Sequence, residues 1–426
     1  MARKKRADPQ IKDKIREQYE VYPYPPRDPR DEAKRLHEGS PSHLFELNHY
    51  IFGGRRDFSK PFKVLVAGGG TGDAAVFLAQ QLADVGCPAE VVYIDLSDAS
   101  RKTAEARVRV RKLTNVIFHQ LSILDLPDSG LGPFDYIDCC GVLHHLEDPA
   151  AGLQALASVL TEDGGIGFML YGELGRSGVY PVQDMMHMIT PDDSPPEKVT
   201  MARRLLAQLP PSNLLNRNPR IQDHLEGDDA KLFDLLLHSR DRAYKVSEIG
   251  ALMGGGGFRI TTFISPVVYD PTLYINDPAL RARLKELDWI EACAFAELLC
   301  GTISKHIFYV TRQSNDTDCV ADPRDVSAIP VFRNADVAAL AEKAKAKGTY
   351  TATIYGMKFA FPSPPLAAAI LTRIDGVRTI ADIRAELQKI NPQLSDVAFQ
   401  NQFLALYGAL NGMSNMFLSL RPIPGK

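Results

Sequence analysis

Residues 64–74 read VLVAGGGTGDA, an apolar run that breaks into glycines and continues into a helical pattern. A strand that enters a glycine turn and then a helix exposes backbone N–H groups at the positive end of that helix. A dinucleotide-binding G-x-G-x-x-G pattern counted from Gly68 needs a third glycine at position 73, which is Asp73. The spacing is instead G-x-G-x-G, which favours a compact ligand across the strand ends over a dinucleotide.

Strand and helix patterns alternate on both sides of this turn. Apolar strands are predicted at 62–67, 89–96, 115–122, 134–143 and 166–171, with helices at 72–86, 99–113 and 149–160 and a turn at TEDGG (161–165). This alternation predicts right-handed crossovers and a doubly wound, Rossmann-like parallel α/β sheet. Two further strand patterns, at 258–265 and 303–312, could complete the same sheet and bring it to seven strands.

Polar residues follow the predicted strands at the edge where open α/β sheets bind ligands. Asp95 ends the second strand 23 residues after Gly72 (95 − 72), where a carboxylate can accept both hydroxyls of a ribose. The next two strands run into LSILDLP (121–127) and CCGVLHHLEDP (139–149). These segments predict one ligand site along a single sheet edge.

Together these segments resemble the class I S-adenosylmethionine-dependent methyltransferases. VLVAGGGTG resembles the first motif of that family, YIDLS the second, LSILDLP the adenine-contacting stretch and GVLHHLEDP the motif after the fourth strand. The resemblance implies S-adenosylmethionine as cofactor and S-adenosylhomocysteine as product. The cofactor-binding residues that it implies are Gly68, Gly69, Gly70, Gly72, Asp95, Leu96, Ser122, Ile123 and Val142.

Two positions depart from the family pattern. Many members carry an acidic residue before the first glycine, which holds the ammonium group of the cofactor, but Val66 and Ala67 stand there in this chain. Ser122 stands where an aspartate commonly binds the adenine, and its hydroxyl can still accept a hydrogen bond from the exocyclic amine.

Methyl transfer from a sulfonium requires mainly orientation and exclusion of water, with a base only where the acceptor is protonated. We expect His145, Tyr171 and Arg176 to act in catalysis, and Tyr24, Tyr180 and Arg242 to contact the acceptor. His144 and His145 could instead be structural or form a shelf for the cofactor. Adjacent histidines lack the spacing of metal ligands, so no metal site is expected.

Composition shifts divide the chain into four parts. Residues 1–60 include the proline-rich VYPYPPRDPRDE, which predicts a lid over the site. We expect residues 61–313 to form the methyltransferase domain, with a helical insertion at about 175–250. A polar linker at 314–325 precedes a C-terminal accessory unit at 326–426. That unit has a winged-helix-like or helix–turn–helix-like pattern, in which Thr379 and Asp382 have capping-box spacing.

The C-terminal unit, with IDGVRTIADI (374–383), resembles the regulatory C-terminal region of some bacterial protein-lysine methyltransferases. It is also consistent with a packing or dimerisation module, which leaves a homodimer open. The charged segment 237–249 is consistent with a solvated face, with salt bridges, or with acceptor binding by Arg240 or Arg242.

The composition of the 426 residues is that of an ordinary globular protein, with 45% hydrophobic and 24% charged residues and a net charge of −3. The net charge gives no general attraction to nucleic acid, and the basic cluster at 2–6 is interpreted as a solvated tail. The residues after that cluster are polar, which indicates no secretory signal, and no run approaches the ~20 apolar residues of a membrane span. Six cysteines without a CxxC pair suggest reduced thiols. We therefore expect a cytoplasmic protein.

The sequence thus predicts an S-adenosylmethionine-dependent methyltransferase whose acceptor is a protein or peptide side chain or a small metabolite. A non-catalytic regulatory protein that binds S-adenosylmethionine is the alternative, motivated by the two departures from the family pattern. A dinucleotide oxidoreductase is disfavoured by the glycine spacing.

Overall fold

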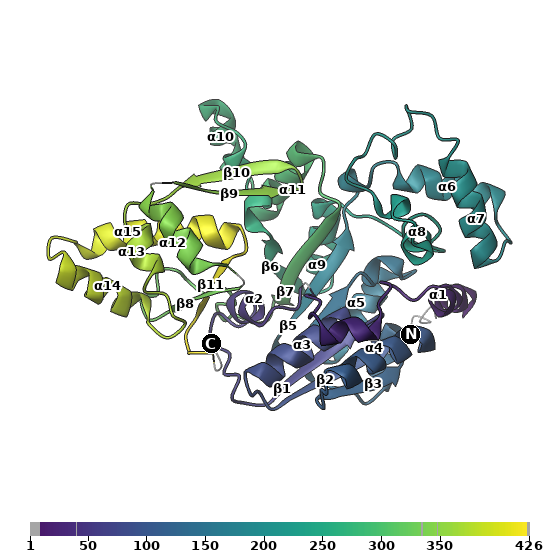
Figure 1. Ribbon diagram of the computed structural model, residues 1–426, viewed down its shortest axis with the longest axis horizontal. Helices are drawn as coiled ribbons and strands as arrows, with labels where there is room; N and C mark the ends of the chain where they lie inside the picture. The colour runs from purple at the N-terminus through teal and green to yellow at the C-terminus, as the bar shows by residue number, and fades with distance from the viewer. Residues whose placement is uncertain (1–8, 40, 334, 347, 424–426) are drawn as a thin grey trace.

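The computed structural model describes residues 9–423 except 40, 334 and 347. Its centre is a seven-stranded sheet in the order β3-β2-β1-β4-β5-β7-β6 (Figure 1). The strands are β1 (Phe62–Ala67), β2 (Ala89–Asp95), β3 (Val116–Gln120), β4 (Phe134–Cys140), β5 (Leu160–Tyr171), β6 (Phe258–Ile264) and β7 (Lys305–Arg312). The predicted Rossmann-like sheet is confirmed, and the two late strands complete it.

The first five strands are parallel, and β7 pairs antiparallel with both β5 and β6. Crossovers between parallel strands bring all their carboxyl ends to one edge. The residues TEDGG, predicted as a turn, are included in β5, but the register with β4 shifts across them, from Phe134↔Leu160 to Tyr136↔Gly165, so an irregularity of the strand lies where the turn was predicted.

Two apolar layers cover the sheet, and alternate residues of β1 belong to opposite layers. Val64 and Val66 pack with α2 (Leu44–Tyr50) and α3 (Asp73–Asp84), and α4 (Asp98–Val110) closes the same face. Leu65 and Ala67 face the layer of α5 (Pro149–Ser158), α9 (Val246–Gly255) and α11 (Trp289–Cys300). Burial on both faces explains why these strands read as continuous apolar runs.

The segment between β5 and β6 contains the predicted helical insertion. Its helices α6 (Val179–Ile189), α7 (Pro195–Leu206) and α8 (Asp229–Leu236) share a small apolar core of their own. Between β6 and β7 lies α10 (Pro278–Leu284) before α11. Short 3-10 helices join the main elements at 29–33, 123–128, 143–145, 174–176, 223–225, 266–269 and 271–273.

The N-terminal residues behave as two pieces. Helix α1 (Pro9–Val21) and the segment after it, residues 22–39, lie along the carboxyl edge of the sheet, and we call residues 22–39 the lid segment. Helix α2 is fully buried and packs between the sheet and the C-terminal unit, where its Asn48 donates to the Ser419 hydroxyl. The basic cluster at 2–6 lies outside the described residues.

The C-terminal unit combines helices with two separate two-stranded sheets. Strands β8 (Ile329–Phe332) and β11 (Met416–Ser419) pair antiparallel, as do β9 (Thr349–Ile354) and β10 (Met357–Pro362). Its helices are α12 (Val337–Lys345), α13 (Ala367–Leu371), α14 (Ile380–Ile390) and α15 (Asp396–Gly412), and Thr379 and Asp382 form the expected capping box. Among the described helices, none has the length and apolar character that crossing a bilayer requires.

Candidate functional site

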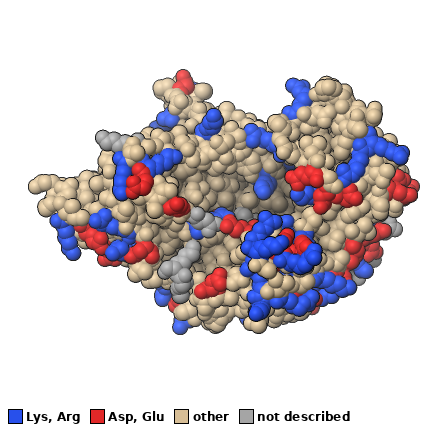
Figure 2. All heavy atoms as spheres, in the orientation of Figure 1, with Lys and Arg blue, Asp and Glu red and all other residues tan. Residues whose placement is uncertain are grey.

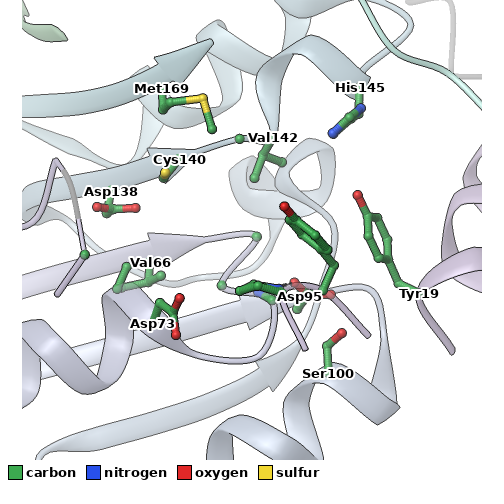
Figure 3. Close-up of a pocket in the computed structure, with 18 of the residues that line it drawn as sticks. Tyr19, Val66, Asp73, Asp95, Ser100, Asp138, Cys140, Val142, His145 and Met169 are labelled. Atoms are coloured by element: carbon green, nitrogen blue, oxygen red, sulfur yellow. Dashed lines mark hydrogen bonds between the residues drawn. The ribbon is translucent and has the colours of Figure 1, made fainter. Parts of the chain in front are cut away.

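A cavity of about 480 Å³ opens at the carboxyl edge of the parallel strands (Figure 3). Its walls come from the glycine turn, the ends of β2, β4 and β5, the lid segment, α1 and α8. Of the residues predicted to bind the cofactor, Gly68, Gly69, Gly70, Asp95, Leu96, Ser122, Ile123 and Val142 line this cavity. Sequence segments that follow four different strands therefore meet in one site.

The glycine turn makes room for protein neighbours. Gly70 has a φ of +52°, and a Cβ there would lie 2.6 Å from the carbonyl oxygen of Tyr24, so any larger residue displaces the lid segment. Gly72 does not line the cavity. A Cβ at this position would lie only 2.7 Å from Cβ of Ala104, so the absence of a side chain lets α3 and α4 approach closely.

The lid segment is held against the turn by backbone and charged contacts. The N–H of Thr71 donates to Tyr24 O at 3.3 Å, and the Thr71 hydroxyl donates to Pro25 O at 2.6 Å. The Arg27 guanidinium donates to both oxygens of Asp73, from Nε at 2.8 Å and from Nη2 at 2.5 Å. Tyr24 and Arg27 both line the cavity, so the lid segment forms part of its wall.

Asp95 lies at the end of β2 as predicted. Its carboxylate accepts the N–H of Gly70 at 2.8 Å and of Ser97 at 2.8 Å, and burial raises the pKa of the carboxyl. Figure 3 places Asp95 and Ser100 on one side of the cavity, and Ser122 lines the wall with its hydroxyl accepting the N–H of Leu124 at 3.3 Å. This side of the cavity therefore presents hydrogen-bond acceptors to a ligand.

Asp138 is a cavity residue that sequence analysis missed. It belongs to β4, pairs in register with Val66 of β1, and is only 1% exposed. The Ser42 hydroxyl donates to it, and burial raises the pKa of its carboxyl to about 6. A charged residue in the apolar strand FDYIDCC was the available sequence signal.

Asp234, from α8, marks the opposite wall and was also missed. Tyr19 Oη donates to one carboxylate oxygen at 3.1 Å, and Tyr171 Oη donates to the other at 3.2 Å. Asp234 is 5% exposed, and burial raises the pKa of its carboxyl. An aspartate within the apolar helix AKLFDLLL was its only sequence signal, and nothing in the sequence placed it beside Tyr171.

His145 lines the cavity, and Figure 3 places it on the same side as Tyr19. Its Nδ1 lies 2.9 Å from Arg240 O, and since a carbonyl only accepts, Nδ1 carries a proton; in the neutral form of the ring the lone pair is then on Nε2. His238 stacks on His145 with ring centroids 3.8 Å apart. His238 Nδ1 accepts the N–H of Arg240, so its Nε2 donates to Tyr19 Oη at 3.1 Å.

Three predicted residues lie outside the cavity wall. Arg176 is buried, lies 3.7 Å over the Tyr171 ring, and pairs with Asp241 at 2.9 Å. Tyr180 accepts from Arg176 Nε at 3.2 Å, and Arg242 pairs with Glu248. Arg176 therefore positions Tyr171 instead of meeting a ligand in the cavity, and Arg242 lies on a solvated salt bridge.

Two groups of side chains have the composition of metal ligands, namely His144, His145 and Asp241, and His145, Asp234 and His238. A metal must lie near the plane of each imidazole that binds it. The rings of His145 and His238 are stacked at 17° and both their Nδ1 atoms are engaged by Arg240, which does not suit a shared ion. Asp241 is already paired with the Arg176 guanidinium.

Comparisons with known proteins agree with this geometry. A family described as a methyltransferase domain matches residues 65–166. An uncharacterized protein of Synechococcus is 29% identical over 69% of this chain and 70% of its own length. A ubiquinone biosynthesis O-methyltransferase of Methylococcus capsulatus is 35% identical over 35% of this chain, and the chain spans about half of that enzyme, 56% of its length.

The solved structure of PKMT2 from Rickettsia typhi has a similar fold. It superposes with a TM-score of 0.59 at 17% identity, covering 88% of this chain and 73% of PKMT2. Its complex with AdoHcy matches equally, with a TM-score of 0.59 at 15% identity over 89% and 75% of the two chains. The likeness covers most of this chain and shows a shared fold.

The cavity residues fit S-adenosylmethionine. The lining includes the carboxylate of Asp95, the hydroxyl of Ser122 and the apolar side chains of Ile123 and Val142, groups that can hydrogen-bond and pack against a nucleoside-containing cofactor. The buried carboxylate of Asp138 lies at the end opposite Tyr19 and His145 (Figure 3).

Proposed function

We propose that this chain, a class I S-adenosylmethionine-dependent methyltransferase, methylates an amine on a protein or peptide side chain. The observation that carries the proposal is the buried carboxylate of Asp234 on the cavity wall, accepting two phenol hydroxyls beside the free Nε2 of His145. S-adenosylmethionine, when bound, supplies a methyl group on a positively charged sulfur.

An amine acceptor suits this wall because its charge is opposite to that of Asp234. In the part of the chain that the structure describes, no lysine or arginine pairs with this carboxylate, so its charge is available to attract an ammonium group. An ammonium has no free lone pair, so the acceptor must lose a proton before its nitrogen attacks.

The side chains can perform that proton transfer. Asp234 or His145 Nε2 accepts one proton from the ammonium, and the freed nitrogen lone pair then bonds to the methyl carbon as the carbon–sulfur bond breaks. The bonding electron pair stays on the sulfur, which becomes neutral. Because methylation leaves the nitrogen positively charged, the same wall stabilises the product.

Buried neighbours hold this wall in position. The Arg176 guanidinium lies on one face of Tyr171, and the His144 ring stacks at 4.2 Å. Burial lowers the pKa of His144 and of His238 well below the usual value for histidine, so both rings are neutral. Tyr19 and Tyr171 therefore keep their hydroxyls directed at Asp234.

A polypeptide acceptor is supported by the shape of the surface. Figure 2 shows this face hollowed above the sheet, between the insertion with α6 to α8 and the C-terminal unit. A hollow flanked by two separate units can receive an extended segment with one side chain directed into the cavity. The resemblance of the C-terminal unit to protein-lysine methyltransferases supports the same acceptor.

The test is transfer of a labelled methyl group to three classes of acceptor: lysine-containing peptides, peptides with every lysine replaced by arginine, and small primary amines. We expect labelling of the lysine peptides alone, with production of S-adenosylhomocysteine. Labelling of the small amines alone would assign a metabolite acceptor, and labelling of the arginine peptides would exclude an amine.

Asp234→Asn should abolish labelling, whereas Asp229→Asn on the same helix should not. Asp229 is a matched control because its side chain is 49% exposed and pairs only at the surface, with Arg203. Binding of S-adenosylhomocysteine without turnover for any acceptor would instead support the non-catalytic alternative.

A further inference from the structure

Asp138 is a buried carboxylate with no cationic partner in the part of the chain that the structure describes. Its hydrogen-bond partners are the hydroxyl of Ser42 and the backbone N–H of Cys140. Burying an ionised carboxylate without a cation is costly, and proteins normally avoid it. Three other buried acids show the usual arrangement, in the pairs Glu32–Arg107, Glu46–Arg333 and Asp241–Arg176.

The place of Asp138 in the sheet is the informative feature. Val66 stands two residues before Gly68, where the family's acidic residue is expected, and β4 puts Asp138 directly beside it in the parallel register Val66↔Asp138. Residues paired in register direct their side chains to the same face of a sheet. Both side chains line the cavity, and Figure 3 shows them together below Cys140.

Of the other acids at this end of the cavity, Asp95 accepts two backbone N–H groups, and Asp73 and Glu38 already have cations. Asp73 accepts from Arg27 at 2.8 Å and pairs with Arg107 at 2.6 Å. Glu38 pairs with Arg333 at 3.4 Å, and its side chain is 48% exposed. Asp138 is therefore the carboxylate whose charge a bound cation at this end of the cavity would balance.

We propose that Asp138 binds the ammonium group of the methionine moiety of S-adenosylmethionine, so that β4 supplies the acid that β1 lacks. Ser42 positions the carboxylate through its hydroxyl, and the cofactor brings the positive charge that the buried carboxylate lacks in the chain itself. The proposal rests on the proposed function only in taking S-adenosylmethionine as the cofactor.

The experiment is calorimetric binding of three probes to the full chain. S-adenosylhomocysteine carries the ammonium group, its deaminated analogue lacks only that group, and methylthioadenosine lacks the whole amino-acid moiety. Asp138→Asn keeps the size of the side chain and removes its charge. Ser42→Ala is the matched control, since it removes the hydrogen bond to Asp138 and keeps the charge.

We expect Asp138→Asn to weaken S-adenosylhomocysteine binding about 10- to 100-fold, the range of a hydrogen bond to a charged group. Binding of methylthioadenosine and of the deaminated analogue should change less than about twofold, because neither has a group for Asp138 to hold. Ser42→Ala should weaken S-adenosylhomocysteine binding by a smaller factor than Asp138→Asn.

Equal weakening of all three probes in Asp138→Asn would overturn the proposal, since it would mean that Asp138 only maintains the shape of the cavity. Unchanged binding of every probe would overturn it as well. Failure of the wild-type chain to bind S-adenosylhomocysteine and methylthioadenosine is a different result, which would count against the cofactor assignment and hence against the proposed function.

Discussion

At the cofactor end of the cavity most of the residues predicted to bind the cofactor, from Gly68 to Ile123, come from consecutive strand-to-helix turns. The opposite end, where the acceptor is proposed to bind, is called the acceptor end. Its four principal side chains come from α1, the turn after β4, the end of β5 and α8, and they are Tyr19, His145, Tyr171 and Asp234. The hydrogen bond between Tyr19 and His238 joins residues 219 positions apart. The first end is built from local segments with recognisable motifs, whereas the second exists only when distant segments meet.

This difference in construction corresponds to a difference in chemistry. The cofactor end offers backbone groups and the single carboxylates of Asp95 and Asp138 to fixed parts of one ligand. At the acceptor end the carboxylate of Asp234 accepts the hydroxyls of Tyr19 and Tyr171, and the imidazole of His238 is hydrogen-bonded to Tyr19. Changes at the first end should therefore alter cofactor affinity, and changes at the second should alter turnover.

The largest effect is expected from Asp234→Asn, which removes the acceptor-end charge and a proton acceptor. Loss of such a group typically costs about 10²- to 10⁴-fold in rate. Single-turnover methyl transfer should fall by that factor while calorimetric binding of S-adenosylhomocysteine stays within about twofold. Asp95→Ala should give the opposite pattern, in which binding of S-adenosylhomocysteine falls more than the single-turnover rate. Equal loss of binding in both variants would erase the distinction between the two ends.

A second large effect is expected from Gly70→Ala. The new Cβ would meet the Tyr24 carbonyl oxygen, and the left-handed backbone costs about 1–2 kcal/mol for a residue with a side chain. Gly86→Ala is the control, because Gly86 also has a positive φ, +66°, but no atom within 4 Å of the added Cβ. We expect S-adenosylhomocysteine binding to fall about 10- to 100-fold in Gly70→Ala only, since the clash displaces the lid segment. Similar binding by both variants would show that the lid contact is unimportant.

Asp138→Asn should stabilise the ligand-free chain at neutral pH. The pKa of Asp138 is about 6 in the folded chain and about 4 in the unfolded chain, so folded-state stability falls as the pH rises from 4 to 6 and stays low above it. Removing the charge should therefore raise the free energy of unfolding by about 1–3 kcal/mol at pH 8 and leave it nearly unchanged at pH 4. Denaturant unfolding at the two pH values measures this, and a loss of stability at pH 8 would contradict the reasoning.

The smallest effect is expected at Tyr24. Its ring lines the cavity, and its backbone carbonyl holds the glycine turn whatever the side chain is. Tyr24→Phe should change cofactor affinity less than about threefold, and Tyr24→Ala should weaken it about tenfold through lost apolar contact. Identical affinity in both variants, measured by calorimetry, would remove the side chain from the lid's function.

The strands of the sheet were predictable because each strand carries its own signal in the sequence. Val64, Leu65 and Val66 are apolar because helices cover both faces of β1, and that burial can be read directly from the sequence. Asp95 was predictable for a similar reason, since its role depends on its distance along the chain from the glycine turn.

The remaining site residues were hidden by distance in sequence. Asp234 and Tyr19 lie in helices whose local patterns indicate ordinary amphipathic packing. Arg176, predicted to act in catalysis, lies outside the cavity and packs its guanidinium on the ring of Tyr171. A pattern after β5 indicates that residues lie near the site but not which way each side chain points.

The sequence by itself determined the alternation of strands and helices, the glycine turn and the resemblance to a methyltransferase, because these depend on neighbours a few residues apart. Only the tertiary structure decided that β4 lies beside β1 with Asp138 next to Val66, and that α8 carries Asp234 to Tyr171. The physical reason is that strand register and helix docking are fixed by the packing of the whole core. The carboxylates of Asp138 and Asp234 reach the cavity only because this packing brings their strand and helix to its wall.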